Sequence, residues 1–471
     1  MSVPECAAVR MGSPTGRAVV AAATLGSGMA MLDGTVVNVA LRTIGKDLHA
    51  SLAQLQWITN AYLLLLASLI LMGGSFGDRF GRRRVFVVGV VWFAVASLIC
   101  GVAPSPEVLI AARALQGIGG ALLTPGSLAM IQGAFAPEDR APAIGAWSGL
   151  GSIAAAVGPF VGGALVDYAS WRWIFLLNLP IAALTVLVAV RSVPETRDPN
   201  ASSHFDVAGA VLAALALGGT TYALIEWGGL GGWIAAILGV VAGVAFVLVE
   251  AHEPEPMLRL ELFHDLTFSA SNVMTLLVYG ALGALTFFVV IQLQTVSGWS
   301  ALSAGAAFVP MTIIMLFLAA RGGRLGQRIG PRIPMTVGPL VMALGTLGML
   351  RIGPDVSYVR DVLPAVVVFG LGLAMMVAPL TATVLAAAPD ENAGIASGVN
   401  NAVARAGSLL AVAALPIAVG LRGADYADPA VFDQSFQRAM IACAGLLAAG
   451  GLVSWFTVRR PEPTAVAEMP A

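Results

Sequence analysis

The sequence contains fourteen apolar stretches, each about 18 to 28 residues long, separated by short polar segments. A helix needs about 20 such residues to cross the roughly 30 Å hydrocarbon core of a bilayer. The alternation expected of β-barrel strands is weak, so each stretch is predicted to be a transmembrane helix. The stretches lie at residues 18–41, 56–76, 85–103, 107–130, 142–165, 172–190, 207–227, 231–250, 267–293, 302–321, 333–350, 361–387, 396–420 and 436–457.

Few charges interrupt these stretches. Lys, Arg, Asp and Glu make up 11% of the 471 residues, against about 25% in an ordinary soluble domain. The net charge of -1 gives no basic surface for nucleic acid. The single lysine, Lys46, is followed by Asp47, so the chain has no Walker A loop and cannot be an ATP-driven pump by itself.

Cysteine and histidine, which often act in catalysis or bind metals, are few. The three cysteines lie far apart, and the four histidines lie in loops without the spacing of metal ligands. Gly73–Gly77 matches the GxSxG pattern of serine hydrolases, but it ends a predicted membrane helix instead of following a strand. The sequence therefore predicts no enzyme, no metal site and no cofactor.

Basic residues are distributed unevenly between alternate loops. Sixteen lie on the side that holds both termini, and seven lie on the other side. Loops rich in Arg and Lys stay in the cytoplasm. Both termini are therefore predicted to be cytoplasmic, as an even number of crossings requires.

An internal repeat supports the number of helices. Residues 74–83 (GSFGDRFGRR) and 323–332 (GRLGQRIGPR) are identical at five of ten positions and lie eight spans apart. Two related halves of six helices would then flank two extra helices. We predict an N-terminal bundle at 1–190, a linker with two extra helices at 191–266 and a C-terminal bundle at 267–471.

The first copy of this repeat resembles the loop between helices 2 and 3 of the major facilitator superfamily. A glycine permits a tight reversal, and an aspartate can pair with the neighbouring arginines. The resemblance implies that the loop gates conformational change through Gly74, Asp78, Arg79, Gly81 and Arg82. The alternative is a basic loop that only fixes the topology.

Other stretches resemble one subfamily, the fourteen-helix drug:proton antiporters. They are the first-helix signature Leu32–Leu41, the RxxQGxG motif Arg113–Gly119, the helix 5 antiporter motif Gly151–Gly163 and the WRWIFxxNxP segment Trp171–Pro180. In the antiporter motif, Gly158 and Pro159 are assigned to gating, because small residues allow close helix approach and proline allows a bend. Packing without any role in transport is the alternative.

Asp33 and Arg113 are charged residues inside predicted spans. At about 1.5 Å per residue, both lie in the outer half of the bilayer. A charge there costs on the order of 3 kcal/mol, so each needs a partner or a water-filled cavity. We predict that Asp33 is the proton carrier and that Arg113 adjusts it, since a nearby cation favours a carboxylate over its protonated form. A structural ion pair that only orders two helices is the alternative.

Polar residues within spans are candidates for a substrate cavity, although ordinary helix packing explains each equally well. They are Asn38, Trp57, Asn60, Tyr62, Gln116, Gln292 and Gln294. The roles of Glu226 and Arg405 stay open.

These features predict an all-helical membrane protein with the major facilitator fold. The predicted function is proton-coupled efflux of small lipophilic compounds from the bacterial inner membrane. Its partners would be substrate, protons and lipid, without nucleic acid or nucleotide, and it would act as a monomer. A proton-linked lipid or metabolite transporter of the same fold is the first alternative, and a non-transporting sensor is a remote one.

Overall fold

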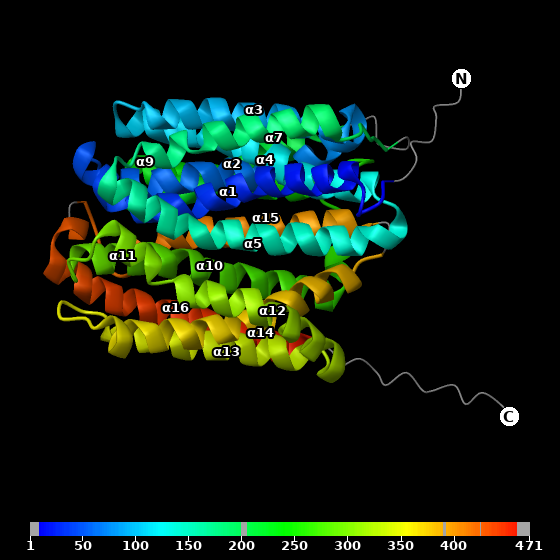
Figure 1. Ribbon diagram of the computed structural model, residues 1–471. Coiled ribbons are helices and arrows are strands. Elements are labelled where there is room, and N and C mark those ends of the chain that lie inside the picture. Colours follow the sequence, from blue (N-terminus) through cyan, green and yellow to red (C-terminus); the bar gives the residue numbers. More distant parts are fainter. Residues whose placement is uncertain (1–8, 199–204, 390–391, 424, 459–471) are drawn as a thin grey trace, which may run out of the picture.

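The computed structural model describes residues 9–198, 205–389, 392–423 and 425–458. Within these residues the regular secondary structure is helical, apart from one isolated β-bridge between Val9 and Phe135. Thirteen of the described helices are long and apolar enough to cross a bilayer. A further helix, α5, is 32 residues long and runs alongside them (Figure 1). Each of the fourteen predicted spans therefore corresponds to a helix or to two helices in line.

Seven helices build the first bundle, with α6 and α7 together forming one crossing. They are α1 (Pro14–Asp47), α2 (Leu52–Phe80), α3 (Arg82–Gly101), α4 (Pro106–Ala134), α5 (Pro137–Tyr168), α6 (Trp173–Leu176) and α7 (Asn178–Ser192). Two extra helices follow, α8 (Val207–Ile225) and α9 (Leu230–His252).

The second bundle repeats this plan, with α11 and α12 in line. Its helices are α10 (Leu266–Thr295), α11 (Ala301–Ala306), α12 (Val309–Ile329), α13 (Arg332–Gly348), α14 (Leu363–Ala386), α15 (Ala393–Ala418) and α16 (Pro429–Thr457). Short 3-10 or π-helical turns lie between them at η1 (Leu260–His264), η2 (Met349–Arg351), η3 (Tyr358–Val362) and η5 (Asp425–Ala427).

The two bundles lie against each other, with α5 and α15 at the boundary between them (Figure 1). The extra helices α8 and α9 pack on each other, and α8 contacts α2 of the first bundle and α15 of the second. The predicted architecture of two six-span bundles with an extra pair of helices is thus confirmed.

The internal repeat is visible in the backbone. Gly81 follows α2 with φ +108°, and Gly330 follows α12 with φ +83°. Residues other than glycine have a strained backbone at such angles. The tight reversal predicted at Gly81 is therefore present between α2 and α3, and Gly330 makes a similar one between α12 and α13.

Hydrogen bonds join the bundles at one end of the molecule. Gln56 donates to the carbonyl oxygen of Val412 (2.8 Å), and Gln294 donates to that of Val39 (2.9 Å). Tyr426 donates to the carbonyl oxygen of Ala50 (2.7 Å), and the Leu302 N–H donates to Asp167 (2.8 Å). Burial raises the pKa of the Tyr426 hydroxyl, so this group keeps its proton and acts as the donor.

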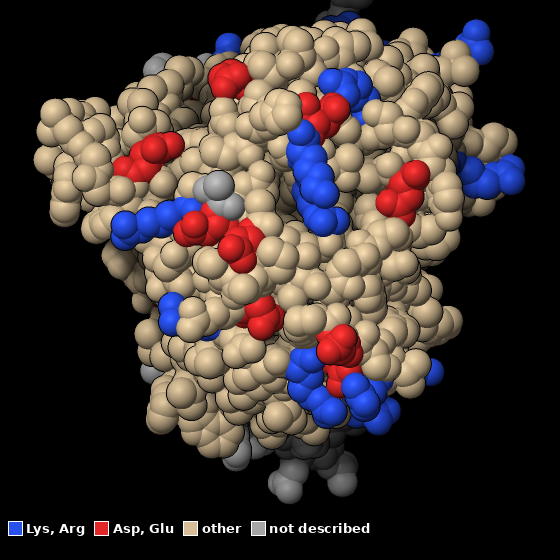
Figure 2. Space-filling view, turned by 90° about the vertical axis from the view of Figure 1, so that its left-hand side faces the viewer, with Lys and Arg blue, Asp and Glu red and all other residues tan. Residues whose placement is uncertain are grey.

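This joined end faces the viewer in Figure 2, where acidic and basic side chains are scattered among uncharged ones. The start of α1 and the end of α16 both lie at the opposite end of the molecule (Figure 1). An even number of crossings places them on the same side of a membrane.

Candidate functional site

An ion pair between Asp33 of α1 and Arg113 of α4 lies inside the first bundle. Each side chain is only 1% exposed. The pair therefore has almost no contact with solvent or lipid, and protein groups alone must replace the water that both charges lose.

A network of neutral side chains surrounds the pair. Gln116 donates to Asp33 (2.8 Å) and accepts from Arg113 (2.6 Å). Asn178 of α7 also donates to Asp33, at 3.2 Å. Ser97 of α3 accepts from both amides. Four helices thus contribute to one buried polar cluster, which we name the Asp33 cluster: Asp33, Ser97, Arg113, Gln116 and Asn178.

The guanidinium of Arg113 has two further partners on α2. Its Nε donates to the carbonyl oxygen of Ile58 at 3.1 Å. Its carbon lies 4.5 Å from the centre of the Tyr62 ring, which is a favourable position for a cation beside an aromatic face. The charge is consequently held by both side-chain and backbone groups.

The RxxQGxG sequence explains how α4 reaches these partners. Arg113 and Gln116 are three residues apart, so they project from the same helix face. A Cβ on Gly117 would lie 2.5 Å from the Tyr62 carbonyl oxygen, and one on Gly119 would lie 2.7 Å from the Phe93 nitrogen. Only glycine allows α2 and α3 to approach α4 this closely.

The predicted gating loop forms an ion pair of its own. Arg82 donates to Asp78 through Nε (2.8 Å) and Nη2 (2.7 Å). Glu195, which follows α7, accepts from the Arg83 N–H at 3.0 Å and lies directly against Gly81. The loop is thus fixed to the segment that leaves the first bundle.

Two other gating candidates also lie in this region. Gly74 packs near Pro125 of α4. The guanidinium of Arg79 lies over the rings of Phe80 and Phe205, at 5.5 and 4.8 Å from their centres.

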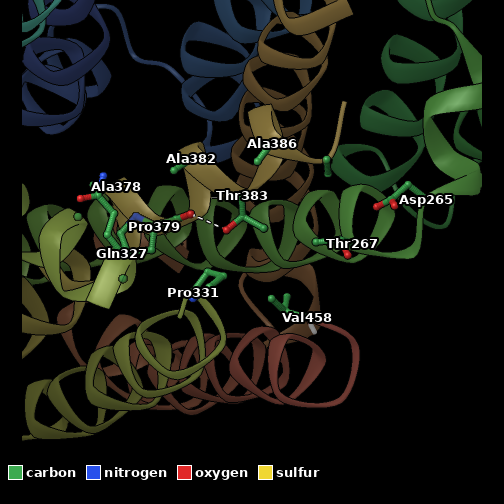
Figure 3. Close-up of a pocket in the computed structure, with 13 residues that line it drawn as sticks. Asp265, Thr267, Gln327, Pro331, Ala378, Pro379, Ala382, Thr383, Ala386 and Val458 are labelled. Atoms are coloured by element: carbon green, nitrogen blue, oxygen red, sulfur yellow. Dashed lines mark hydrogen bonds between the residues drawn. The ribbon is translucent and has the colours of Figure 1, made fainter. Parts of the chain in front are cut away.

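The corresponding region of the second bundle contains a cavity of about 660 Å³. Gln327 of the repeated motif lies at one end of it, and Asp265 and Thr267 at the start of α10 lie at the other (Figure 3). Thr383 on the wall donates to the Pro379 carbonyl at 2.8 Å (Figure 3). The equivalent of Asp78 is thus a neutral amide beside an open space.

The helix 5 motif brings α5 against both bundles. Gly158 packs on Thr35 of α1, and a Cβ on Gly162 would lie 2.7 Å from Val36. On the opposite side, the Pro159 carbonyl oxygen touches Gly305 of α11. Gly158 and Gly162 therefore serve close packing on α1, and the neighbouring Pro159 lies where the two bundles meet.

The seven residues predicted to line a cavity have different surroundings. Gln116 belongs to the Asp33 cluster and Tyr62 covers Arg113, as described above. Gln294 joins the bundles. Gln292 donates to the carbonyl of Ile352 and to Asp433 of α16. Trp57 packs on Tyr222 of α8. Asn60 is fully buried and Asn38 is partly exposed. Their role in substrate binding stays a prediction.

A second cavity, of about 800 Å³, lies between α5 and α12 and is mostly apolar. Its polar residues are Thr35, Thr312 and Tyr358, and Phe160 and Val309 are among its apolar ones. Drug-sized ligands occupy cavities of this size and character. Sequence reasoning did not identify these residues, because apolar side chains in a span look alike whether they face lipid, protein or a cavity.

Two residues whose roles stayed open differ in environment. Glu226 is exposed at the end of α8 beside Trp227. Arg405 is partly buried on the face of α15 that meets α2, between Gly398 beside Leu71 and Val412 beside Gln56. Arg405 forms no ion pair with any described residue.

Comparison with known proteins identifies the family. Residues 23–412 match the family model described as Major Facilitator Superfamily. The tetracenomycin C resistance and export protein of Streptomyces glaucescens is 36% identical, covering 86% of this chain and 76% of the relative. The methylenomycin A resistance protein of Bacillus subtilis is 34% identical, with 97% of both chains covered.

Solved transporter structures share the fold at low identity. A bacterial homologue of the human lysosomal transporter Spinster, in an inward-facing and occupied conformation, superposes with a TM-score of 0.67 at 17% identity. It covers 95% of this chain and 97% of that one. The inward-open xylose transporter XylE of E. coli gives a TM-score of 0.65 at 14% identity, with 95% and 97% covered.

Because Asp33 and Arg113 form a buried ion pair, we expect substitutions at these two positions to have coupled effects on stability. Asp33→Asn and Arg113→Gln should each lower the free energy of unfolding by about 3 to 5 kcal/mol, since each leaves one buried charge unpaired. The double variant should lose much less than the sum, as thermal unfolding in detergent would measure. The exposed pair Asp47–Arg172 is the control, with an expected coupling below about 1 kcal/mol. Additive losses at Asp33 and Arg113 would contradict the analysis.

Proposed function

This chain belongs to the major facilitator superfamily, and on that premise we propose that it exports a small lipophilic compound from a bacterial cell in exchange for protons. The buried pair of Asp33 and Arg113 carries the proposal, because a titratable charge inside a membrane helix is costly without a function. The relatives named above are resistance and export proteins, which supports export over import.

The geometry suggests how a proton would be coupled to movement. The Asp33 carboxylate accepts bonds from Arg113, Gln116 and Asn178. A proton on either oxygen would compete with these donors, so protonation requires the carboxyl group to leave at least one of them. Because the donors belong to α4 and α7, proton binding on α1 would change the packing of three helices.

Movement of the bundles would complete the cycle. They are joined at the end that holds Ala50 and Tyr426, and we assign this end to the outside of the cell. The gating loop at Asp78 lies at the other end, where the protein would open and close toward the cytoplasm. Gly158 and Pro159 lie at the boundary and would allow α5 to shift between the bundles.

We propose the placement in the membrane from the positive-inside rule. Both termini would be cytoplasmic, and the protein would lie in the inner membrane and act as a monomer. The first bundle would end near residue 190 and the second would begin near residue 267, with α8 and α9 in the linker between them.

Asp33→Asn should abolish proton-driven efflux while the protein stays folded. The amide keeps hydrogen-bonding capacity but cannot carry a proton, so substrate binding should lose its pH dependence. Dye efflux from everted vesicles and binding to purified protein would measure both effects. Asp47→Asn, near the end of the same helix, is the matched control and should retain transport. Unchanged pH dependence in Asp33→Asn would place the proton site elsewhere.

Asp78→Asn should slow transport strongly and leave substrate binding intact. The change weakens the pair with Arg82 at the end of α2, and neither residue lines the cavity between α5 and α12. Transport in proteoliposomes and binding in detergent would be compared. Glu138→Gln alters an exposed pair with Arg10 and serves as the control. Full transport by Asp78→Asn would assign the loop a topological role only.

Topology can be tested with single epitope tags. Tags at residues 1 and 471, and in the connectors 191–206 and 251–266, should be shielded in intact cells. A tag at Gly298, between α10 and α11, should be accessible from outside. An accessible tag at any of the first four positions would overturn the proposed orientation.

A further inference from the structure

Two acidic side chains outside the Asp33 cluster meet where the extra helices begin and end. Asp206 precedes α8 and caps it by accepting from the Gly209 N–H at 2.6 Å. Glu250 lies in the last turn of α9 and is only 3% exposed. Neither residue takes part in the proposed transport mechanism.

Backbone groups of the connector after α9 bind both carboxyl groups. The Leu258 N–H donates to Glu250 Oε2 at 2.9 Å. The Met257 N–H lies 3.5 Å from Asp206 Oδ2. The connector is therefore held against the start of α8 through these two acids.

Of the four carboxyl oxygens only Glu250 Oε1 has no donor within the described part of the chain, and it lies beside Asp206 Oδ2 at Gly209. A Cβ on Gly209 would lie 2.6 Å from Glu250 Oε1 and in contact with Asp206 Oδ2. Both oxygens thus occupy the space above this glycine. Glu250 Oε1 is buried and has no hydrogen-bond donor among the described residues.

Among the described residues, no positive charge pairs with either acid, since neither Asp206 nor Glu250 forms an ion pair with a Lys, Arg or His. Glu253, at the start of the connector, adds a further negative charge nearby. Two carboxylates that share a buried site repel each other, and one retained proton removes the repulsion and supplies the missing donor.

We propose that Asp206 and Glu250 form a proton-binding site in which one proton is shared between Glu250 Oε1 and Asp206 Oδ2. This site is separate from Asp33 and does not depend on the proposed transport activity. Loss of the proton leaves two facing carboxylates, which push the end of α9 and its connector away from the start of α8.

The site adjoins the gating loop of the first bundle. Phe205, the residue before Asp206, stacks on Phe80 with 5.6 Å between the ring centres. Its ring centre also lies 4.7 Å from that of Phe76, in an edge-on arrangement. The Arg79 guanidinium lies over the same Phe205 ring. A displacement of Asp206 therefore reaches the loop that contains Asp78 through direct aromatic contacts.

Infrared difference spectroscopy tests whether the proton is present. In the purified wild-type protein, titration through the neutral range should reveal the C=O stretch of a protonated carboxyl group that disappears at higher pH. This band should be lost in Glu250→Gln, whose amide can donate to Asp206 and so imitate the protonated form. Asp206→Asn should also remove it, and Glu253→Gln should keep it. A wild type without the band, or a band that survives both substitutions, would overturn the proposal.

Amide hydrogen exchange tests the structural consequence. After correction for intrinsic rates, protection at Met257 and Leu258 should fall in the wild type as the proton is lost. In Glu250→Gln the protection should no longer change with pH. If protection at Met257 and Leu258 also fell with pH in Glu250→Gln, another titrating group would control the connector, which would contradict the proposal. Because neither measurement involves transport, failure of the proposed export activity would leave these results unaffected.

Discussion

Close approach between helices is the constraint on which the rest of this structure depends. Helices in a bilayer gain little by burying apolar side chains against one another, because lipid is equally apolar. Contact must come from packing of backbones and from polar bonds. In the first bundle, Gly117 and Gly119 bring α4 against α2 and α3, and this approach carries Arg113 to Asp33. At the boundary between bundles, Gly163 of α5 and Gly305 of α11 do the same.

Buried charge is handled in two different ways in this protein. Asp33 is paired with a guanidinium and accepts hydrogen bonds from two amides. Glu250 lies beside Asp206 instead, with backbone N–H donors and no ion pair to a described cation, and for this arrangement we propose a shared proton. The first arrangement holds helices of one bundle together, and the second joins the extra helices to the connector that leads into the second bundle.

The contacts between the bundles are unequal along their length, which bears on how an exporter of this fold could move. Polar bonds from Gln56, Gln294 and Tyr426 join one end. At the other end lie the two copies of the repeated loop, one paired through Asp78 and one with Gln327 beside a cavity. The apolar cavity between α5 and α12 lies on the same boundary. A rocking motion about the joined end would change both the loops and the cavities together.

The sequence by itself determined the number and extent of the spans, because hydropathy and helix length depend only on neighbouring residues. It also identified the repeat, and it placed Arg113 and Gln116 on one helix face through their spacing. Only the tertiary structure decided what these side chains meet. Asp33 and Arg113 are 80 residues apart, and Ser97 and Asn178 join them through helix packing that no local pattern encodes. For the same reason the contact of Trp57 with Tyr222 and the meeting of Asp206 with Glu250 were not foreseen. Periodicity gives the face of a helix on which a residue lies, but the neighbour of that face depends on how all the helices pack.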